Sequence, residues 1–330
     1  MKPNDLINAI GEAEAAAEKT KTAPDKEARR AAFLAKKKEL NERFDNSIQQ
    51  MREGNSELFR GFLNAAARMP QDEIFKNLVL IAAQKPDALL VKPGYVWKKK
   101  GYKLPPADKV IHLFVKNGVW IDKEGDTRDN YDPKECYDVA DLGVRVAMPA
   151  LPDTDHNSVI SAIYTVLSDP AKYENQVKDS DRRSPVTFAI SADQKSDALY
   201  DPATSSITVR QGLPPKECCE GIIMEMCHRE RYLGGWEKEP RTREDMFIAY
   251  SATYVICRKL ALPTEDFDFP PVFLEASDNK TFERELRSIV KTANTIGERL
   301  DTQLFSMRRE AQKGARAETM QESGSPVQGV

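Results

Sequence analysis

Hydrophobic and polar residues alternate with a helical spacing over the first quarter of this chain. Residues 1–45 are rich in Ala, Lys and Glu but poor in large apolar side chains, which predicts a loose, mostly solvated helical arm. From Ile48 to Leu80 the apolar positions recur every three or four residues, as on one face of a helix. Pro70 interrupts this pattern, and a second helix is predicted over Asp72–Gln84. Lys85-Pro86-Asp87 should end it, because a residue before proline avoids the helical region.

The spacing then changes to the period of a β-strand. Strands are predicted at Val110–Val115 and Val119–Ile121, and Asn117-Gly118 lies between them. Asn-Gly favours a type I′ turn because both central residues need positive φ, so a tight hairpin is expected here. Asp122–Lys134 is interpreted as a polar, acidic loop, and Tyr137–Asp141 as a third strand.

The second half of the chain predicts short strands embedded among longer helices, which makes the fold class α+β. Pro149–Asp155 has the composition of a linker, and the last residues that of a disordered tail. The predicted helices are Val159–Leu167, Pro214 to about Tyr232, Thr242–Leu260 and the amphipathic Phe282–Met307, and the predicted strands are Thr187–Ser191, Ala198–Tyr200 and Ser206–Val209.

Composition excludes several classes of protein. The 330 residues include 49 Lys and Arg against 52 Asp and Glu, a net charge of −3, so this is not a wholly basic nucleic-acid coat protein. The clean apolar run at Leu78–Ala83 is far shorter than a membrane span, and Met1–Glu18 lacks the apolar core of a secretory signal. Five cysteines without a CxxC pair predict a reduced, cytoplasmic protein.

Charge is nevertheless segregated within the chain. The segment Lys76–Lys116 carries nine lysines and two acids, a net charge of +7, whereas Ile121–Asp141 has a net charge of −5. Three aromatic residues, Tyr95, Trp97 and Tyr102, flank the run Lys98–Lys100. Ammonium groups that follow phosphates, beside rings that stack on bases, are what unpaired nucleic acid requires. The alternative is that Trp97 belongs to the core and the lysines are only solvated.

The same segment resembles a known family. The blocks NLVLIAAQKPD (77–87), GYVWKKKG (94–101) and Lys109, followed by YDV (137–139), are similar to the N-terminal domain of ArdC-type antirestriction proteins. The resemblance covers about Leu58 to Asp141. It implies a small α+β domain that binds single-stranded DNA. Proteins of this family are encoded on plasmids and conjugative elements, so the resemblance also implies a role in protecting incoming DNA. The nucleic-acid-binding residues that follow from it and from the charge pattern are Asn77, Gln84, Tyr95, Trp97, Lys98, Lys99, Lys100, Tyr102, Lys103 and Lys109.

ArdC-type proteins also carry a zincin-like domain, in which HExxH places two histidines and a glutamate on one helical face. The matching stretch here begins with Met224 and retains only Glu225 and His228. A thioether is a poor zinc ligand. We therefore expect no catalytic residue, no metal and no cofactor. Glu225 would be a remnant general base and His228 a remnant ligand, and the two would form an ion pair or a hydrogen-bonded core pair.

These inferences divide the chain into a helical arm (1–45), an ArdC-like domain (46–148), a degenerate zincin-like domain (149–272), an amphipathic helix (273–318) and a tail (319–330). The expected function is that of a single-stranded DNA-binding accessory protein of a mobile element, without enzymatic activity. Two alternatives stay open. One is a zinc metallopeptidase in which His228 is joined by Glu244 or Asp245, and the other is a module whose C-terminal half binds a protein partner. Cys227 is weighed as a nucleophile and disfavoured, because neighbours on a helix point about 100° apart.

Overall fold

The computed structural model describes residues 3–143, 155–169, 184–238, 241–271, 276 and 278–323, with side chains from Glu27 to Lys313 within these ranges. It is an α+β protein, as predicted. The elements are α1 Pro3–Arg52, α2 Ser56–Arg68, α3 Phe75–Gln84, β1 Val91–Pro93, α4 Gly94–Lys99, β2 Ile111–Ile121, β3 Thr127–Asp138, α5 His156–Ser168, β4 Thr187–Ser191, β5 Ala198–Asp201, β6 Ser206–Arg210, α7 Pro215–Leu233, α8 Arg243–Lys259 and α9 Asn279–Ser323, with 3-10 turns at Ala107–Lys109 and Val139–Leu142.

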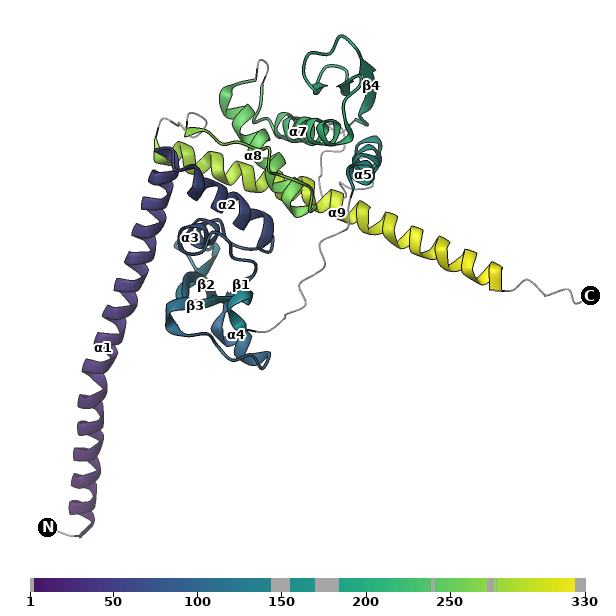
Figure 1. The fold of residues 1–330 in the computed structure, drawn as a ribbon. Helices are drawn as coiled ribbons and strands as arrows, with labels where there is room; N and C mark the ends of the chain where they lie inside the picture. Colours follow the sequence, from purple (N-terminus) through teal and green to yellow (C-terminus); the bar gives the residue numbers. More distant parts are fainter. Residues whose placement is uncertain are drawn as a thin grey trace, which may run out of the picture.

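Helix α9 crosses the molecule between two groups of elements (Figure 1). On one side lie α2, α3 and the antiparallel sheet β1-β3-β2, and on the other lie α5, α7, α8 and β4. The second sheet has the order β4-β6-β5, with β4 parallel and β5 antiparallel to β6. Both long helices extend beyond this body, α1 at its N-terminal end and α9 at its C-terminal end.

Aromatic side chains join the two groups into one core. The ring of Phe59 on α2 stacks on Phe247 of α8 at 5.5 Å and meets the edge of Phe269 at 5.2 Å. Phe247 in turn stacks on Phe282 of α9 at 6.3 Å. All four rings are buried in a single apolar cluster that includes residues from both predicted domains. The predicted boundary at residues 148 and 149 lies outside the described residues and stays a prediction.

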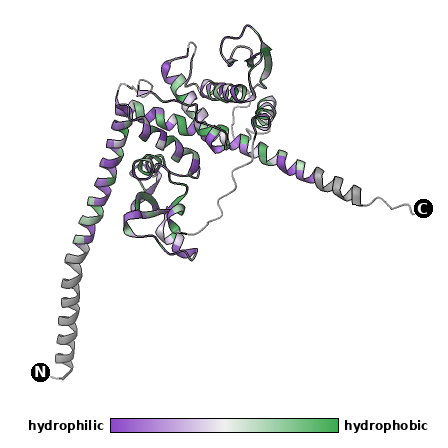
Figure 2. Cartoon of the chain, viewed as in Figure 1, coloured by the Kyte–Doolittle hydropathy of each residue, from purple (hydrophilic) through white to green (hydrophobic). Residues whose placement is uncertain are grey.

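The N-terminal arm is helical, as predicted, but it does not end at residue 45. Helix α1 continues to Arg52, and its described exposed part is largely hydrophilic (Figure 2). Leu40, Phe44 and Ile48 are buried where the helix reaches the core. The helical pattern from Ile48 to Leu80 is also interrupted once more than expected, at Gly54, whose φ of +100° suits glycine.

The hairpin predicted at Asn117-Gly118 is wrong. Strand β2 runs through this pair, which forms a bulge against β3 between Lys116 and Val119, and Gly118 adopts the positive φ that the bulge needs. The chain reverses later, where the Asp122 carboxylate accepts hydrogen bonds from the backbone N–H groups of Glu124 and Asp126. Most of the predicted acidic loop is therefore strand β3.

The remaining elements of the second half are confirmed. Helix α7 has proline in its first turn, and α8 begins with a capping box in which Thr242 and Asp245 satisfy each other's backbone N–H groups. Helix α9 is longer than expected and continues to Ser323, so the first residues of the predicted tail are helical and residues 324–330 lie outside the described residues. Most of the linker predicted at Pro149–Asp155 lies outside the described residues. None of the described helices combines the length and apolar character that crossing a bilayer requires.

Candidate nucleic-acid interface

The short helix α4 is held rigidly against the sheet. The indole N–H of Trp97 donates to the backbone carbonyl of Tyr137 at 2.9 Å, and the Trp97 ring is fully buried. At Gly94 a Cβ would lie 3.0 Å from the Tyr137 ring and 3.1 Å from Leu104, so the first turn fits closely only without a side chain. Gly101, with φ of +84°, ends the segment. This anchoring fixes the direction in which the lysines after Trp97 leave the surface.

Those lysines carry the uncompensated charge of the basic segment. Lys85 is neutralised by Asp138 at 3.1 Å and Asp141 at 2.6 Å, and Lys116 is paired with Asp129 at 2.6 Å. By contrast, five exposed lysines on α4 and the loop after it have no carboxylate partner within the described residues. They are Lys98, Lys99, Lys100, Lys103 and Lys109. The lysines of the predicted patch that are exposed and have no carboxylate partner among the described residues therefore lie at residues 98–109.

The structure separates the three aromatic residues predicted to stack on bases. Tyr95, on α4, is 61% exposed and its ring is accessible. Trp97 is fully buried, because its N–H is satisfied by backbone and its ring fills a small cluster with Tyr137, Val139 and Leu142. Tyr102 is half-buried and meets the Trp97 ring edge-on at 5.9 Å. The expectation that Trp97 stacks on a base is thus corrected to a structural role, and Tyr95 remains the stacking candidate.

Asn77 and Gln84 also have structural roles in place of the expected nucleic-acid contacts. Strand β2 is an edge of its sheet, and both amides on α3 bind its outer backbone. Asn77 donates to the Phe114 carbonyl at 2.8 Å and accepts from the Phe114 N–H at 2.9 Å. Gln84 makes the same two bonds with His112, at 3.1 and 3.0 Å. Because both amides are saturated, neither is available to a bound strand.

Sequence reasoning missed one aromatic residue. Trp120 is 53% exposed near the end of β2, between the exposed Val119 and Ile121. Reading Asn117-Gly118 as a turn assigned these residues to a separate short strand, so the projecting hairpin end was not considered. The signal was present in the sequence as three consecutive large apolar residues beside an acidic stretch.

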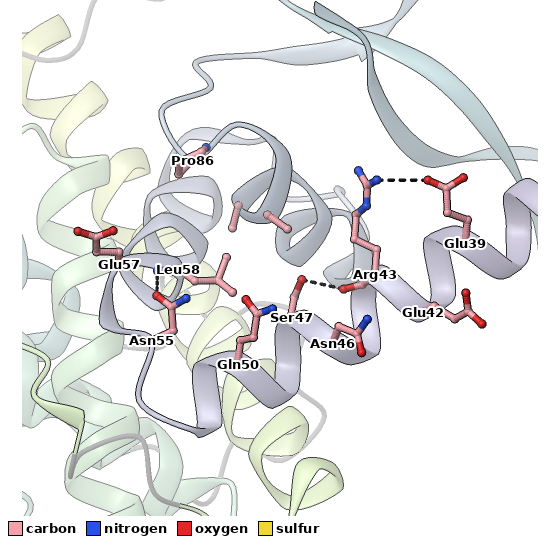
Figure 3. A pocket seen from close by; sticks show the side chains of 12 residues that line it. Glu39, Glu42, Arg43, Asn46, Ser47, Gln50, Asn55, Glu57, Leu58 and Pro86 are labelled. Carbon is pink, nitrogen blue, oxygen red and sulfur yellow. Dashed lines mark hydrogen bonds and ion pairs between the residues drawn. The ribbon is translucent and has the colours of Figure 1, made fainter. Parts of the chain in front are cut away.

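A hollow of about 630 Å³ lies between α1, α2 and α3 (Figure 3). Its charged lining consists of Glu39, Glu42 and Glu57 against Arg43, and Arg43 is already paired with Glu39 at 3.2 Å. A net negative lining repels phosphates. This hollow therefore does not extend the basic patch.

Glu225, the predicted remnant base, is bound by an arginine. The Arg241 guanidinium contacts both of its carboxylate oxygens, at 2.7 and 3.0 Å. The pair also brackets Tyr200 on the edge strand β5, because Glu225 accepts the Tyr200 N–H at 2.7 Å and Arg241 donates to the Tyr200 carbonyl at 3.3 Å. The Glu225 carboxylate thus accepts one hydrogen bond at Oε1 and two at Oε2.

His228 binds a different acid from the one predicted. Its Nδ1 lies 2.8 and 3.0 Å from the two oxygens of Glu237, so it forms no pair with Glu225. Glu237 also contacts Arg241 at 3.2 Å and Arg231 at 3.6 Å, and Arg231 bonds Asp245 at 2.7 Å. All these side chains except Arg241 are buried. The helix that resembles HExxH is therefore the centre of a buried network of salt bridges.

This network does not fit a metal ion. Met224 packs against the apolar core, Glu225 is bound by Arg241, and of the two residues retained from HExxH only His228 has a buried side-chain atom, Nε2, without a hydrogen-bond partner among the described residues. The guanidinium of Arg241 also places a positive charge between the two carboxylates. Asp245, one of the acids in the alternative ligand set, is bound by Arg231 and Thr242. Among the described residues, three acidic groups do converge at Asp122, Glu124 and Asp126, but this is the exposed turn of the β2–β3 hairpin.

The cysteines are unsuited to nucleophilic chemistry. All five are free, and burial raises the pKa of Cys136 and Cys219 to about 12. Burial also raises the pKa of the Cys227 thiol strongly, and its sulfur faces the Thr253 hydroxyl at 3.9 Å. The thiol form predominates at neutral pH, whereas a nucleophile requires the thiolate, so this geometry does not support Cys227 as a nucleophile.

Comparisons with known proteins give structural matches only. No protein-family model and no curated protein matches the sequence. The crystal structure of metal-free antirestriction protein ArdC from plasmid R388 matches with a TM-score of 0.43 and 13% identity, over 69% of this chain and 85% of that chain. The Mn(II)-bound structure of ArdC from the same plasmid matches with a TM-score of 0.46 and 11% identity, over 78% and 97%. The chain is thus similar in structure to ArdC antirestriction proteins.

Proposed function

We propose that this protein binds single-stranded DNA through α4 and the loop after it. The observation that carries the proposal is the set of five exposed lysines that have no carboxylate partner among the described residues, beside the exposed ring of Tyr95. Lysines that are not neutralised within the chain are free to replace the counterions of a phosphate backbone. A ring beside them supplies a stacking surface for an unpaired base.

The shape of the patch favours a single strand over a duplex. Helix α4 has six residues, about 9 Å, which is too short to act as a recognition helix along a major groove. The residue expected to contact bases is Tyr95, whose ring can stack on an unpaired base but not on a base that is already stacked within a duplex. Together with the resemblance of residues 58–141 to ArdC-type domains, this supports single-stranded DNA as the ligand.

The resemblance also suggests the biological setting. We infer a cytoplasmic accessory protein of a plasmid or conjugative element that protects incoming DNA from restriction. We infer that the second half serves this role without catalysis, which the pairing of both Glu225 carboxylate oxygens with Arg241 supports. It would stabilise the fold or bind a protein partner. The corresponding test is plasmid transfer into a restricting host, with and without this protein, beside transfer into a host without restriction.

The binding proposal is tested by fluorescence anisotropy. Purified protein is titrated into a labelled 30-nucleotide strand, and separately into the same sequence as a duplex, at several salt concentrations. We expect tighter binding to the single strand and a slope of log K against log salt of about −3.5 if five lysines each neutralise a phosphate. The variant K98E/K99E/K100E should lose most of this affinity.

A matched control makes the test specific. The variant K195E/R309E/K313E changes the total charge equally but alters exposed positions away from α4. It should bind like the wild type apart from a small non-specific loss. Equal losses in both variants would show that net charge governs binding, and absence of binding at low salt would refute the proposed function.

A further inference from the structure

We propose that a second surface, on α9, contacts the same single strand. We call it the α9 stripe and define it by Arg284, Arg287 and Lys291. Residues three and four apart share one face of a helix, so these cations follow one another over about 10 Å. The opposite face carries the buried Phe282, Leu286 and Ile289, which fix the helix on the core. The stripe is therefore a rigid line of positive charge, and the inference rests on the proposed function.

At one end of the stripe lies an accessible indole. Trp236 follows the Gly234–Gly235 turn at the end of α7 and is 51% exposed. The Lys291 ammonium lies 3.9 Å from the centre of its ring, a cation–π contact that holds the indole against α9. Both residues, with Arg284, Arg287 and Ser288, line a hollow of about 360 Å³. This volume places a planar ring next to three cations.

Beside the middle of the stripe, at Arg287, a second hollow of about 410 Å³ contains Trp120 and two further cations, Lys37 and Lys76. Arg287 lines both hollows and so joins them. Its guanidinium stacks over the Phe75 ring at 4.1 Å and pairs with Glu283 at 2.6 Å, which holds it in this position. The two hollows thus meet at one fixed arginine, with an exposed indole in each.

Charge complementarity favours a nucleic acid as the occupant. Besides the buried Arg231, five cations line the two hollows, and one of them, Arg287, is paired with Glu283. The lining carboxylates are those of Glu244 and Asp129, and Asp129 is already paired with Lys116. Arg284 and Lys291 have no ion pair within the described residues. An acidic peptide would use the cations but has no need of two half-exposed indoles. A single strand uses both, because bases stack on rings while phosphates meet the cations between them.

Tryptophan fluorescence of the full-length chain provides a direct test. The chain has three tryptophans, and Trp97 is buried, so quenching on addition of a 30-nucleotide oligothymidylate reports on Trp120 and Trp236. We expect quenching in the wild type and a smaller effect in W120F and in W236F. Quenching that is unchanged in both variants would overturn the proposal.

Anisotropy of the same strand separates this inference from the proposed function. The variant R284E/K291E should bind about tenfold more weakly, with a salt slope shallower by about 1.4. The control R309E/K313E has the same charge change on the same helix and should bind like the wild type. If R284E/K291E binds like the wild type while K98E/K99E/K100E does not, the α9 stripe is refuted and the proposed function stands. The reverse result supports the stripe and refutes the α4 patch. If the wild type does not bind the strand, both proposals are refuted. If it binds polyglutamate but not the strand, the stripe is a site for an acidic protein.

Discussion

Replacing Arg241 by methionine tests whether the buried salt bridges of the second half hold the fold in place of a metal. The substitution removes two charged hydrogen bonds to Glu225 and one contact to Glu237. The side chain of Glu225 is 2% exposed and that of Arg241 13%. Breaking a buried pair by removing one partner costs about 3–5 kcal/mol, because a charge stays buried without compensation. The partial exposure of Arg241 admits some water, so we expect the lower end, about 3 kcal/mol.

Urea unfolding followed by circular dichroism measures this change. For a chain of this size the slope m is about 3 kcal/mol per molar urea, so the midpoint should fall by about 1 M. The matched control is Arg210→Met, which breaks the pair between Arg210 on β6 and Asp197 just before β5. That pair is 42% and 45% exposed, and exposed pairs contribute at most about 1 kcal/mol.

A second substitution identifies the buried charge as the cause. In the R241M background, Glu225→Gln removes the uncompensated carboxylate while its amide oxygen can still accept the Tyr200 N–H. The double variant should therefore be more stable than R241M alone by about 1–2 kcal/mol, a coupling typical of contacting charges. If R241M shifts the midpoint no more than R210M, or if Glu225→Gln destabilises R241M further, the reasoning is refuted.

Three further predictions follow from the structure. Burial and, to a smaller extent, the charge of Glu244 raise the pKa of Glu285 to about 7, above about 4.3 in an unfolded chain, so stability should fall as pH rises from about 4.5 to 7. E285Q should flatten this dependence and raise the free energy of unfolding at pH 8 by roughly 1 kcal/mol after allowance for screening, and an unchanged pH profile would contradict it. W97A should cost about 3–5 kcal/mol in thermal unfolding, whereas Y95A should keep the wild-type melting temperature and weaken strand binding about five- to tenfold; the opposite pattern would reverse their roles. Added Zn²⁺ or Mn²⁺ should leave the melting temperature of metal-free protein unchanged, and a rise that disappears in H228A would restore a metal site.

The sequence predicts most elements of the second half because their signals are local. The prolines before α7 and the capping residues of α8 act within one helical turn, and the structure places both helices where these residues indicate. The hairpin was misplaced because Asn-Gly satisfies a bulge as well as a turn, since both need a positive φ. What decides between them is the pairing of nine β2 residues with β3 on both sides of the bulge, which no local pattern contains. The charge segregation was visible in the sequence, but the ion pairs that neutralise Lys85 and Lys116 join residues distant in the chain.

Edge strands explain why motif residues were misassigned in both halves. Asn77 and Gln84 on α3 saturate the outer backbone of β2, and Glu225 with Arg241 does the same for Tyr200 on β5. An unpaired strand edge invites association with other chains, so side chains that cover it have a structural reason to be polar and buried. Such residues resemble a functional motif in sequence, because amides and carboxylates at helical spacing also bind ligands. Only the folded structure distinguishes the two cases, because it shows that each of these polar groups is hydrogen-bonded to the backbone of a strand. The lysines of α4 and of the loop after it, and the cations of the α9 stripe, are exposed instead, which is why we propose them as the charges that contact a ligand.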